Sequence, residues 1–318
     1  MEQTSIIIAT LNRPHDLQRA LASIAANTAE PLEVLIVDQG DTQATARIVQ
    51  ASGLTMARII TCTFKSLTRA RNKGWAKAKG AYVLFIDDDV ALAKDYLANA
   101  ERYMQTNQAV QGICGMDVLA HNKQTAFITT LLATCGQISS LTNESVVLAS
   151  GQNVYRFTGA IERSTQWLSG CNMFLRTQLF NENFTFNEGF VRWCFGEDVM
   201  LTYQIYKKYG QGSLQYLPSL ALHHYQSPHA RLVQPALIKM KVIYRYIFWK
   251  NEIHNENFLR TISYVVSQIT LTLYTVFRSH HPIKVTTLFL QTYMYLYKYR
   301  KLVCTGDIDY NAFILKDT

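Results

Sequence analysis

The chain has 318 residues, of which 48% are hydrophobic and 17% are charged, and its formal net charge is +8. This composition is typical of a globular protein whose core occupies one or two domains. The six cysteines contain no CxxC pair and no regular spacing, which argues against a zinc site or a disulfide framework and favours a cytoplasmic protein. Glu2 and Gln3 follow Met1 where a secretory signal would be basic, so we expect no such signal.

Short apolar runs alternate with helical patterns in the first part of the chain. The runs expected to be strands are residues 5–9, 34–37, 58–62 and 83–86. Residues 17–24 carry apolar side chains every three or four positions, as one face of a helix does. Residues 67–79 are also expected to be helical, with Gly80 ending the helix. This alternation predicts a doubly wound parallel sheet, in which ligands bind beyond the carboxyl ends of the strands.

Three adjacent carboxylates, Asp87, Asp88 and Asp89, end the fourth run. Adjacent acids repel one another, so they need a cation or several hydrogen-bond donors. In an extended chain Asp87 and Asp89 point to one side and Asp88 to the other. Two oxygen ligands on one side suit Mg²⁺ or Mn²⁺ carrying a diphosphate. A solvated acidic turn is the alternative for the triplet taken alone.

Polar residues also follow the first two expected strands, at residues 10–13 and at Asp38. They should therefore lie at the same sheet edge as the acidic triplet. No GxGxxG follows the first strand and no GxxxxGK[ST] occurs, which argues against a dinucleotide fold and a P-loop enzyme. Residues 94–119 are expected to form a helix and a further strand. Residues 120–164 have a weak polar pattern, which fits either a segment that covers the site or a surface excursion.

Regular patterns return near residue 167 and lead to two further groups of polar residues. Residues 196–201 begin a helix that is expected to end near residue 210, and Glu197 and Asp198 lie in its first turn. The helix dipole favours acids at that place whatever their function. Residues 213–222 are predicted to form a strand that ends at His223 and His224, which are either structural residues or metal ligands.

The last third of the chain, from Arg231 on, is predicted to be helical, basic and aromatic. Residues 226–318 contain 12 Lys and Arg against 5 Asp and Glu. Such a region fits an anionic membrane surface or core packing, for example in a homodimer. Its longest uncharged run lies between Arg260 and Arg278 and contains several Ser, Thr and Gln, so we expect a packed or surface-lying helix and not a membrane span.

Taken in order, these segments resemble the family 2 glycosyltransferases with the GT-A fold. The residues that carry the resemblance are Ile7-Ile8-Ala9-Thr10-Leu11-Asn12-Arg13, Leu35-Ile36-Val37-Asp38, Arg71-Asn72-Lys73-Gly74, Ala78-Lys79-Gly80, Asp87-Asp88-Asp89, Ser169-Gly170-Cys171-Asn172 and Gly196-Glu197-Asp198. The likeness covers residues 4–225 except the segment 120–164. It implies an α/β fold with a Rossmann-like, mostly parallel sheet flanked by helices, followed by a C-terminal helical extension.

The resemblance implies inverting transfer of a sugar from a nucleoside-diphosphate sugar, with Mg²⁺ or Mn²⁺ as cofactor. The residues implied to bind the nucleotide sugar are Thr10, Asn12, Arg13, Asp38, Arg71, Asp87 and Asp88. Asp89 would bind the metal, with Asp87 and one histidine as further ligands, and His223 is preferred over His224. Asp198 is implied as the general base, with Glu197 beside it. These roles fit the chemistry, since a divalent ion neutralises the leaving diphosphate and a carboxylate takes the acceptor proton.

The expected organisation is a GT-A domain at residues 1–225, with a donor-binding half at 1–118 and an acceptor half at 119–225, and a helical region at 226–318. The expected partners are the nucleotide-sugar donor and a glycan or lipid-linked acceptor of cell-surface polysaccharide or glycolipid synthesis, and not nucleic acid. The expected location is the cytoplasm, with the inner face of the cell membrane as the peripheral alternative.

Three other functions compete with this interpretation. The pI of about 9.1 suggests a nucleic-acid-binding protein, but the basic residues avoid the expected site and no recognition motif occurs. A nucleotidyltransferase would share the sheet and the metal, but it would usually have a Gly-rich phosphate loop after the first strand. A catalytically silent scaffold would not need Asp89, Asp198 and His223.

Overall fold

A computed structural model describes residues 3–120, 134–137, 140, 142–157, 159–192, 194–227 and 234–316. The chain divides into two compact units. The first unit comprises Met1–Gln124, Arg156–Arg192 and Glu197–Ala230, and the second comprises Thr125–Tyr155, Trp193–Gly196 and Arg231–Thr318. Part of the unassigned segment 120–164, including residues 121–133, lies outside the described residues. The functional division at residue 225 stays a prediction.

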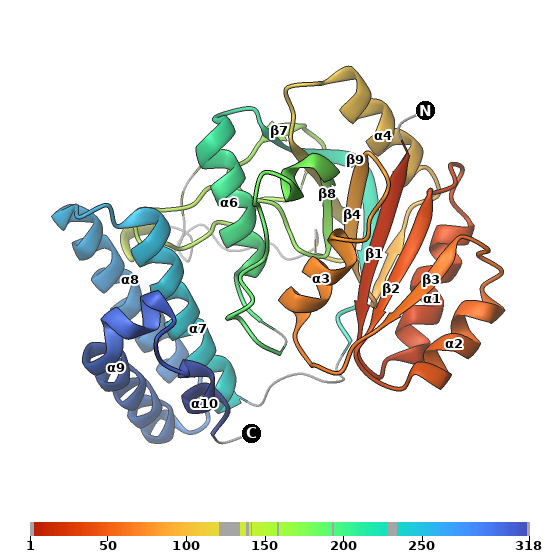
Figure 1. The fold of residues 1–318 in the computed structure, drawn as a ribbon. Coiled ribbons are helices and arrows are strands. Elements are labelled where there is room, and N and C mark those ends of the chain that lie inside the picture. The colour runs from red at the N-terminus through yellow and green to blue at the C-terminus, as the bar shows by residue number, and fades with distance from the viewer. Residues whose placement is uncertain are drawn as a thin grey trace. The chain divides into compact units, whose positions relative to one another are not determined.

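A mixed sheet forms the centre of the first unit (Figure 1). Its strand order is β3-β2-β1-β4-β8-β6-β9-β5, and β7 pairs with β9. The strands are β1 (Thr4–Thr10), β2 (Glu33–Asp38), β3 (Ala57–Thr61), β4 (Tyr82–Asp87), β5 (Val90–Leu92), β6 (Gly112–Asp117), β7 (Arg163–Ser164), β8 (Asn172–Arg176) and β9 (Leu214–His224). The helices of this unit are α1 (Pro14–Ala25), α2 (Thr42–Ala51), α3 (Leu67–Trp75), α4 (Tyr96–Thr106), the short η1 (Thr177–Phe180) and α6 (Glu197–Tyr209).

The strands β3, β2, β1 and β4 are parallel, as the sequence predicts. Thr10 pairs with Asp38, and Ala9 pairs with Asp87, so the carboxyl ends of three strands meet at one edge. The rest of the sheet is mixed, because β8 runs antiparallel to β4 and β6, and β5 runs antiparallel to β9. The direction of these later strands could not be predicted, because an apolar run reveals a strand but not its neighbour.

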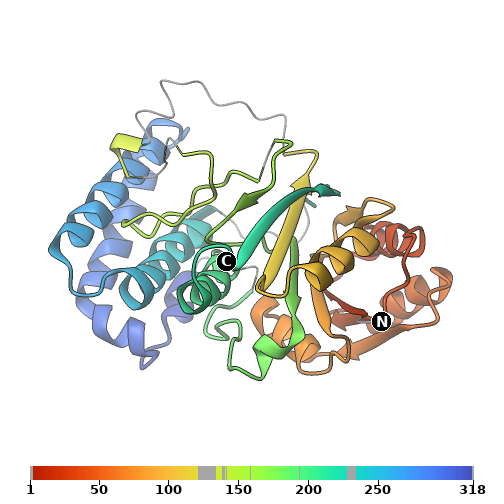
Figure 2. The ribbon, with the colours of Figure 1, turned by 90° about the horizontal axis from the view of Figure 1, so that it is seen from above.

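Both faces of β1, β2 and β4 are buried, which is why these strands are continuous apolar runs, whereas the edge strand β3 is partly exposed. On one face Ile6 and Ile8 pack in a cluster with Leu17 of α1 and with residues of α4. On the other face Trp75 of α3 meets the ring of Phe85 edge-on, with 5.3 Å between ring centroids. Figures 1 and 2 show these helices on either side of the strands. The helices therefore fix the strand ends that carry the polar residues.

The expected end of α3 at Gly80 is wrong. The helix ends at Trp75, and Gly80 lies in the turn before β4. An added Cβ at Gly80 would lie 2.5 Å from the carbonyl oxygen of Gln3 and 2.7 Å from the nitrogen of Ser5. Gly80 is thus explained by its close approach to β1 and not by a helix cap.

Helix α2 and strand β5 are among the elements that were not predicted. Helix α2 begins after Asp41, whose side chain accepts hydrogen bonds from the backbone N–H groups of Gln43 and Ala44. Asp is a favoured N-cap residue, so this start was readable from the sequence. The short strand β5 follows the acidic triplet directly and pairs with β9, and its three residues are too few to show a periodic pattern.

The second unit is built from helices, as expected for the C-terminal region (Figure 1). They are α7 (Gln234–Phe248), the π-helical η2 (Trp249–Ile253), α8 (Phe258–Phe277), α9 (Pro282–Thr305) and α10 (Tyr310–Leu315). The Trp249 indole N–H donates to the Ala149 carbonyl over 3.2 Å, and its ring stacks on Tyr264 with centroids 4.3 Å apart. Among the described residues, no helix combines the length and the hydropathy that a membrane crossing requires.

Candidate active site

Asp87, Asp89 and His224 come together at the carboxyl end of β4. One potential ligand atom from each side chain lies within 4.8 Å of the other two. Asp87 ends β4, Asp89 precedes β5, and His224 ends β9. The pairing of Val90 with His224 brings the imidazole to the acids. Two carboxylates and an imidazole form a donor set that suits a divalent cation such as Mn²⁺ or Mg²⁺.

Asp89 and His224 strongly affect one another, since His224 Nε2 lies 3.2 Å from Asp89 Oδ1. Burial lowers the pKa of His224, but the bond to Asp89 has the larger opposite effect, and the pKa is raised to about 11. Burial raises the pKa of Asp89, but His224 and the Ser227 N–H, which donates to Oδ2 over 2.7 Å, bring it below its usual value. Apart from this ion pair, Asp89 Oδ1 is buried and accepts no hydrogen bond within the described part of the chain. Such a carboxylate oxygen fits a metal ligand.

We expected His223 as the preferred histidine ligand, whereas the structure places His224 beside the acids. Neighbouring residues in a strand point to opposite faces, so only one of the two can face the carboxylates. His223 stacks with Tyr225 on the other face, with 6.3 Å between ring centroids. The preference for His223 is therefore corrected to His224.

Asp88 is separated from the other two acids, as predicted, although Asp88 and Asp89 lie in a turn between β4 and β5 and not in an extended strand. Its side chain is buried and accepts hydrogen bonds from Thr10 Oγ1 at 2.8 Å and Arg13 Nη1 at 3.0 Å. Burial raises the pKa of Asp88 to about 7, although Arg13 and Thr10 act in the opposite direction. Arg13 also lies 3.9 Å from Asp89. Thr10 and Arg13 thus connect the loop after β1 to the acidic triplet.

Arg71 links the triplet to the first turn of α6. Its side chain is 2% exposed, and its guanidinium contacts Asp87 Oδ1 at 2.8 Å, Glu197 Oε1 at 3.0 Å and the Gly170 carbonyl oxygen at 2.9 Å. The planar, permanently charged guanidinium suits several acceptors at once. Four segments far apart in sequence are therefore held together by one side chain.

Asp198 lies beside this network. Its Oδ2 accepts from the Gly170 N–H at 2.8 Å and its Oδ1 from the Val199 N–H at 2.8 Å. Burial raises the pKa of Asp198 despite these hydrogen bonds. Burial and the neighbouring Asp198 also raise the pKa of Glu197 to about 7, against the effect of Arg71. A carboxylate with a raised pKa is a better proton acceptor near neutral pH.

Asp38 and Asn12 shape the loops after β2 and β1. Asp38 Oδ1 accepts from the Gly40 N–H at 2.9 Å, whereas its Oδ2 is buried and accepts no hydrogen bond in the described residues. Asn12 has φ 55° and accepts from the Asp41 N–H at 2.9 Å. A Cβ at position 40 would lie 2.1 Å from Asn12 Oδ1, so a larger residue there would displace the Asn12 side chain. The buried Asp38 oxygen can accept a ligand N–H group.

Some structural contacts of this site were not predicted. The backbone of Gly170 serves both Arg71 and Asp198, and the Asn172 side chain accepts from the Gly115 N–H at 3.0 Å and donates to the Gly115 carbonyl at 3.3 Å. Both Gly170 and Asn172 belong to the segment 169–172 that carries the family resemblance, so their importance was readable but their partners were not. The bond from Ser227 to Asp89 spans 138 positions and carries no sequence signal.

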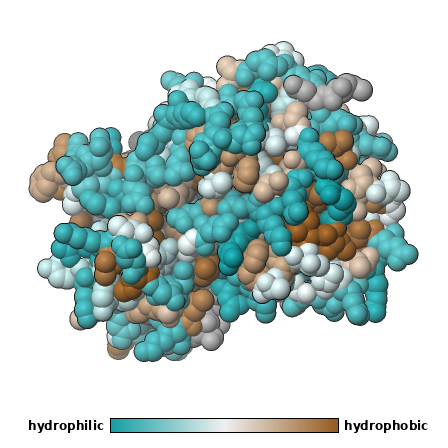
Figure 3. All heavy atoms as spheres, in the orientation of Figure 1, coloured by the Kyte–Doolittle hydropathy of each residue, from teal (hydrophilic) through white to brown (hydrophobic). Residues whose placement is uncertain are grey.

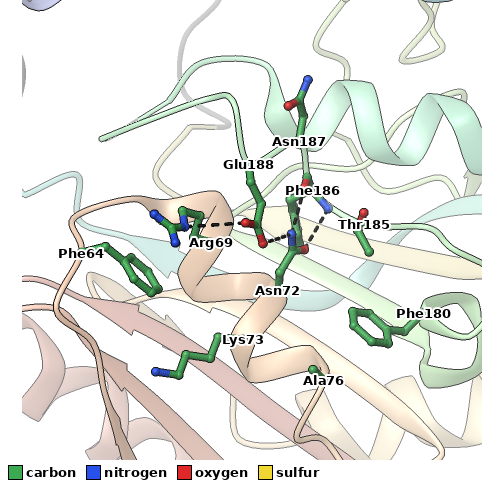
Figure 4. Close-up of a pocket in the computed structure, with 10 residues that line it drawn as sticks. All are labelled: Phe64, Arg69, Asn72, Lys73, Ala76, Phe180, Thr185, Phe186, Asn187 and Glu188. Carbon is green, nitrogen blue, oxygen red and sulfur yellow. Dashed lines mark hydrogen bonds and ion pairs between the residues drawn. The ribbon is translucent and has the colours of Figure 1, made fainter. Parts of the chain in front are cut away.

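A groove of about 590 Å³ runs along the outer side of α3 (Figure 4). Phe64 and Phe180 line its two ends, and its polar side chains bond within the protein. Asn72 Nδ2 donates to the Phe186 carbonyl over 2.9 Å, and Arg69 pairs with Glu188 at 3.6 Å. The acids of the triplet, Glu197, Asp198 and His224 do not line this groove, so it is separate from the site at the strand ends.

Comparison with known proteins relates the chain to glycosyltransferases. Residues 5–131 match the sequence model of the family described as Glycosyl transferase family 2. Over 110 residues the chain is 27% identical to Glycosyltransferase GlyA of Streptococcus pneumoniae serotype 4, a match that covers 34% of this chain and 16% of GlyA. The matched segment is therefore a small part of that relative.

Solved structures with the same fold share less of the sequence. S. aureus TarS in its fragment 1–349 superposes with a TM-score of 0.56 at 17% identity, covering 91% of this chain and 81% of that one. GalNAc-T7 gives a TM-score of 0.54 at 14% identity, covering 78% and 50%. At such identities the likeness concerns the fold, and it confirms the GT-A architecture implied by the sequence. Residues 5–131 therefore match the glycosyl transferase family 2 model, and the chain has a GT-A fold.

Proposed function

We propose that this chain transfers a sugar from a nucleoside-diphosphate sugar to a hydroxyl group of an acceptor. The observation that carries the proposal is the Arg71 network, which joins Asp87 of the cluster Asp87, Asp89 and His224 to the acids that open α6. The family match over residues 5–131 supports it. TarS 1–349 was crystallised in complex with UDP-GlcNAc, and GalNAc-T7 with UDP, GalNAc and Mn²⁺, so a UDP-sugar is the first donor to test.

Asp87, Asp89 and His224 would hold a divalent cation, Mn²⁺ or Mg²⁺. Bound there, the ion would neutralise charge on the departing nucleoside diphosphate. The position of the buried Asp89 Oδ1 beside the His224 imidazole, 3.2 Å away, supports this role, and so does the Mn²⁺ in the GalNAc-T7 crystal structure. Thr10 and Arg13 would keep Asp88 fixed behind the ligands, so that Asp87 and Asp89 stay on one side.

Asp198 would act as general base and remove the proton of the acceptor hydroxyl. The Gly170 and Val199 N–H groups orient its carboxylate, and its raised pKa favours proton uptake near neutral pH. Glu197, which Arg71 holds, would position the helix start and not contact the acceptor. A single displacement with one base and no protein nucleophile would invert the anomeric carbon.

The loops after β1 and β2 would bind the nucleoside. The buried Asp38 Oδ2 would accept an N–H group of the base, and Asn12 would fix the loop around it. The acceptor would be a glycan or a lipid-linked glycan of cell-surface polysaccharide or glycolipid synthesis, as the family resemblance implies. The C-terminal helices would face either a membrane surface or a second copy of the chain.

A panel of UDP-, GDP- and dTDP-sugars tests the proposal. The experiment measures donor hydrolysis and the thermal shift of the full chain, with Mn²⁺, with Mg²⁺ and with EDTA. We expect one nucleotide to stabilise the protein and one of its sugars to turn over, both only with metal present. If no member of the panel shifts the melting temperature and none is hydrolysed, the proposal is wrong.

A further inference from the structure

The second unit exposes apolar side chains along one face of α8. Phe258, Ile262, Val265, Ile269 and Leu273 recur at intervals of three or four, and all are exposed, Phe258 to 74%. This spacing puts them in one stripe along most of the helix. Buried residues lie on the opposite side, as Tyr264 and Ser267 do. A helix whose solvent-facing side is as apolar as its buried side is unusual in a protein surrounded by water.

Helix α9 carries a second stripe. Ile283, Leu290, Met294 and Tyr297 lie on one face, and Met294 and Tyr297 are 71% and 75% exposed. Figure 3 shows apolar side chains among polar ones over the C-terminal helices. The two helices are joined by only four residues, 278–281, and form an antiparallel hairpin.

The two stripes lie on the same side of the hairpin. The Tyr293 hydroxyl of α9 is 2.9 Å from Thr272 Oγ1 and 3.4 Å from the Gln268 carbonyl oxygen, which marks the line of contact between the helices. Successive residues of an α-helix are rotated by about 100° around the helix axis. In each helix the stripe is therefore rotated by about a quarter turn from the residues that contact the other helix. Viewed from its own N-terminus, each helix shows this rotation in the same direction. In an antiparallel pair, equal rotations of the same sense bring both stripes to one side.

The positive charge of the α8–α9 hairpin indicates which kind of surface it binds. Residues 258–305 contain 6 Lys and Arg and no Asp or Glu. Lys301 lies on the α9 stripe, and Lys298 and Lys284 flank it on the side away from α8. All three are exposed. Apolar side chains with lysines beside them match a bilayer surface with anionic headgroups.

A second copy of the chain fits this face less well. Self-association through the stripes would bring the lysines of two copies close together, with no carboxylate in the hairpin to neutralise them. Like charges in an interface oppose association. Anionic lipid supplies the missing negative charge.

We propose that the α8–α9 hairpin lies in the surface of an anionic lipid membrane, with both stripes among the headgroups. The stripes bury apolar side chains in the bilayer surface, and the α9 lysines contact lipid phosphates. No helix needs to cross the bilayer. This inference does not depend on the sugar-transfer reaction.

The test is co-sedimentation of the full chain with phosphatidylcholine vesicles, with and without phosphatidylglycerol. The variants are Ile269→Ser with Leu273→Ser on the α8 stripe, and Lys284→Glu with Lys298→Glu and Lys301→Glu on α9. Matched controls in the first unit are Ile161→Ser, at an isoleucine that is 67% exposed, and Lys65→Glu with Lys77→Glu and Lys79→Glu. Circular dichroism and light scattering establish that each variant is folded and give its oligomeric state.

We expect the unaltered chain and both controls to bind anionic vesicles. We expect each hairpin variant to bind these vesicles at least about tenfold more weakly than the unaltered chain. Equal binding by the hairpin variants and the controls would overturn the proposal. So would equal binding to vesicles with and without phosphatidylglycerol, or no vesicle binding at all. A dimer that the α8 variant dissociates, without vesicle binding, would assign the face to a second copy instead.

Discussion

Arg71 shows what could be read from the sequence at the level of one residue and what could not. It belongs to a segment that carries the family resemblance, and its charge suggests a phosphate contact. In the structure its guanidinium contacts Asp87, Glu197 and the Gly170 carbonyl. Residue type and local pattern therefore indicated residues that the structure brings together, whereas their pairing depends on the fold. The choice between His223 and His224 failed for the same reason, because it depends on which face of β9 meets β5.

Replacing Asp198 with Asn tests the general base. The amide keeps the shape of the side chain but cannot take up the acceptor proton. We expect kcat to fall by about 10²–10⁴-fold while the thermal shift with donor and Mn²⁺ is unchanged. Near-normal turnover in this variant would refute the base assignment.

The pKa of Glu33, at the sheet edge opposite the site, predicts how the unfolding free energy of the protein depends on pH. Burial raises its pKa, but hydrogen bonds from Ser5, the Lys79 N–H and Arg58 together lower it below the usual value of 4.5. A lowered folded-state pKa gives stability that is present above pH 4.5 and is lost as the pH falls further. We expect Glu33→Gln to cost about 1–3 kcal/mol at neutral pH and to flatten the acid limb of the stability curve. Urea unfolding across the pH range measures both effects, and an unchanged acid limb would contradict the assignment.

The pairing of β6 with β9 contains an irregularity at Gly115. The register shifts between Cys114 and Met116, and the backbone of Gly115 is held by Asn172. The sequence predicted both strands, since each has a clear apolar pattern. It did not predict the irregularity, because the requirement for glycine arises from a strand that is distant in the sequence.

Gly115→Ala tests this packing. A Cβ at position 115 would lie 1.7 Å from the Leu220 carbonyl oxygen, so the backbones of β6 and β9 must separate. We expect a loss of about 1–3 kcal/mol or more of unfolding free energy. Thermal unfolding measures it, and a melting temperature equal to that of the unaltered chain would show that the strands are not held this closely.

The two units of the molecule differ in how far the sequence explains them. The first unit has the predicted strands, and all proposed catalytic and nucleotide-binding residues belong to it. The second unit has the predicted helices and most of the excess positive charge. Helix periodicity alone did not reveal its exposed stripes, because which face of a helix is covered depends on tertiary packing.

Removal of the metal tests whether nucleotide binding to the first unit depends on a bound cation. If the cluster of Asp87, Asp89 and His224 binds a cation that in turn binds the nucleotide, UDP should stabilise the protein only when Mn²⁺ is present. At about 100 times the dissociation constant the stabilisation is about 2.7 kcal/mol. Calorimetric melting with UDP, before and after EDTA treatment, measures this difference. A full shift in EDTA would separate nucleotide binding from the metal.

The most direct measurement compares Mn²⁺-dependent donor turnover in His224→Ala and in its neighbour His223→Ala. The account predicts that loss of the His224 imidazole weakens Mn²⁺ binding by more than about tenfold and abolishes turnover at low metal concentration. It predicts that His223→Ala behaves like the unaltered chain. If His223→Ala loses metal-dependent turnover and His224→Ala retains it, the proposed metal site is contradicted.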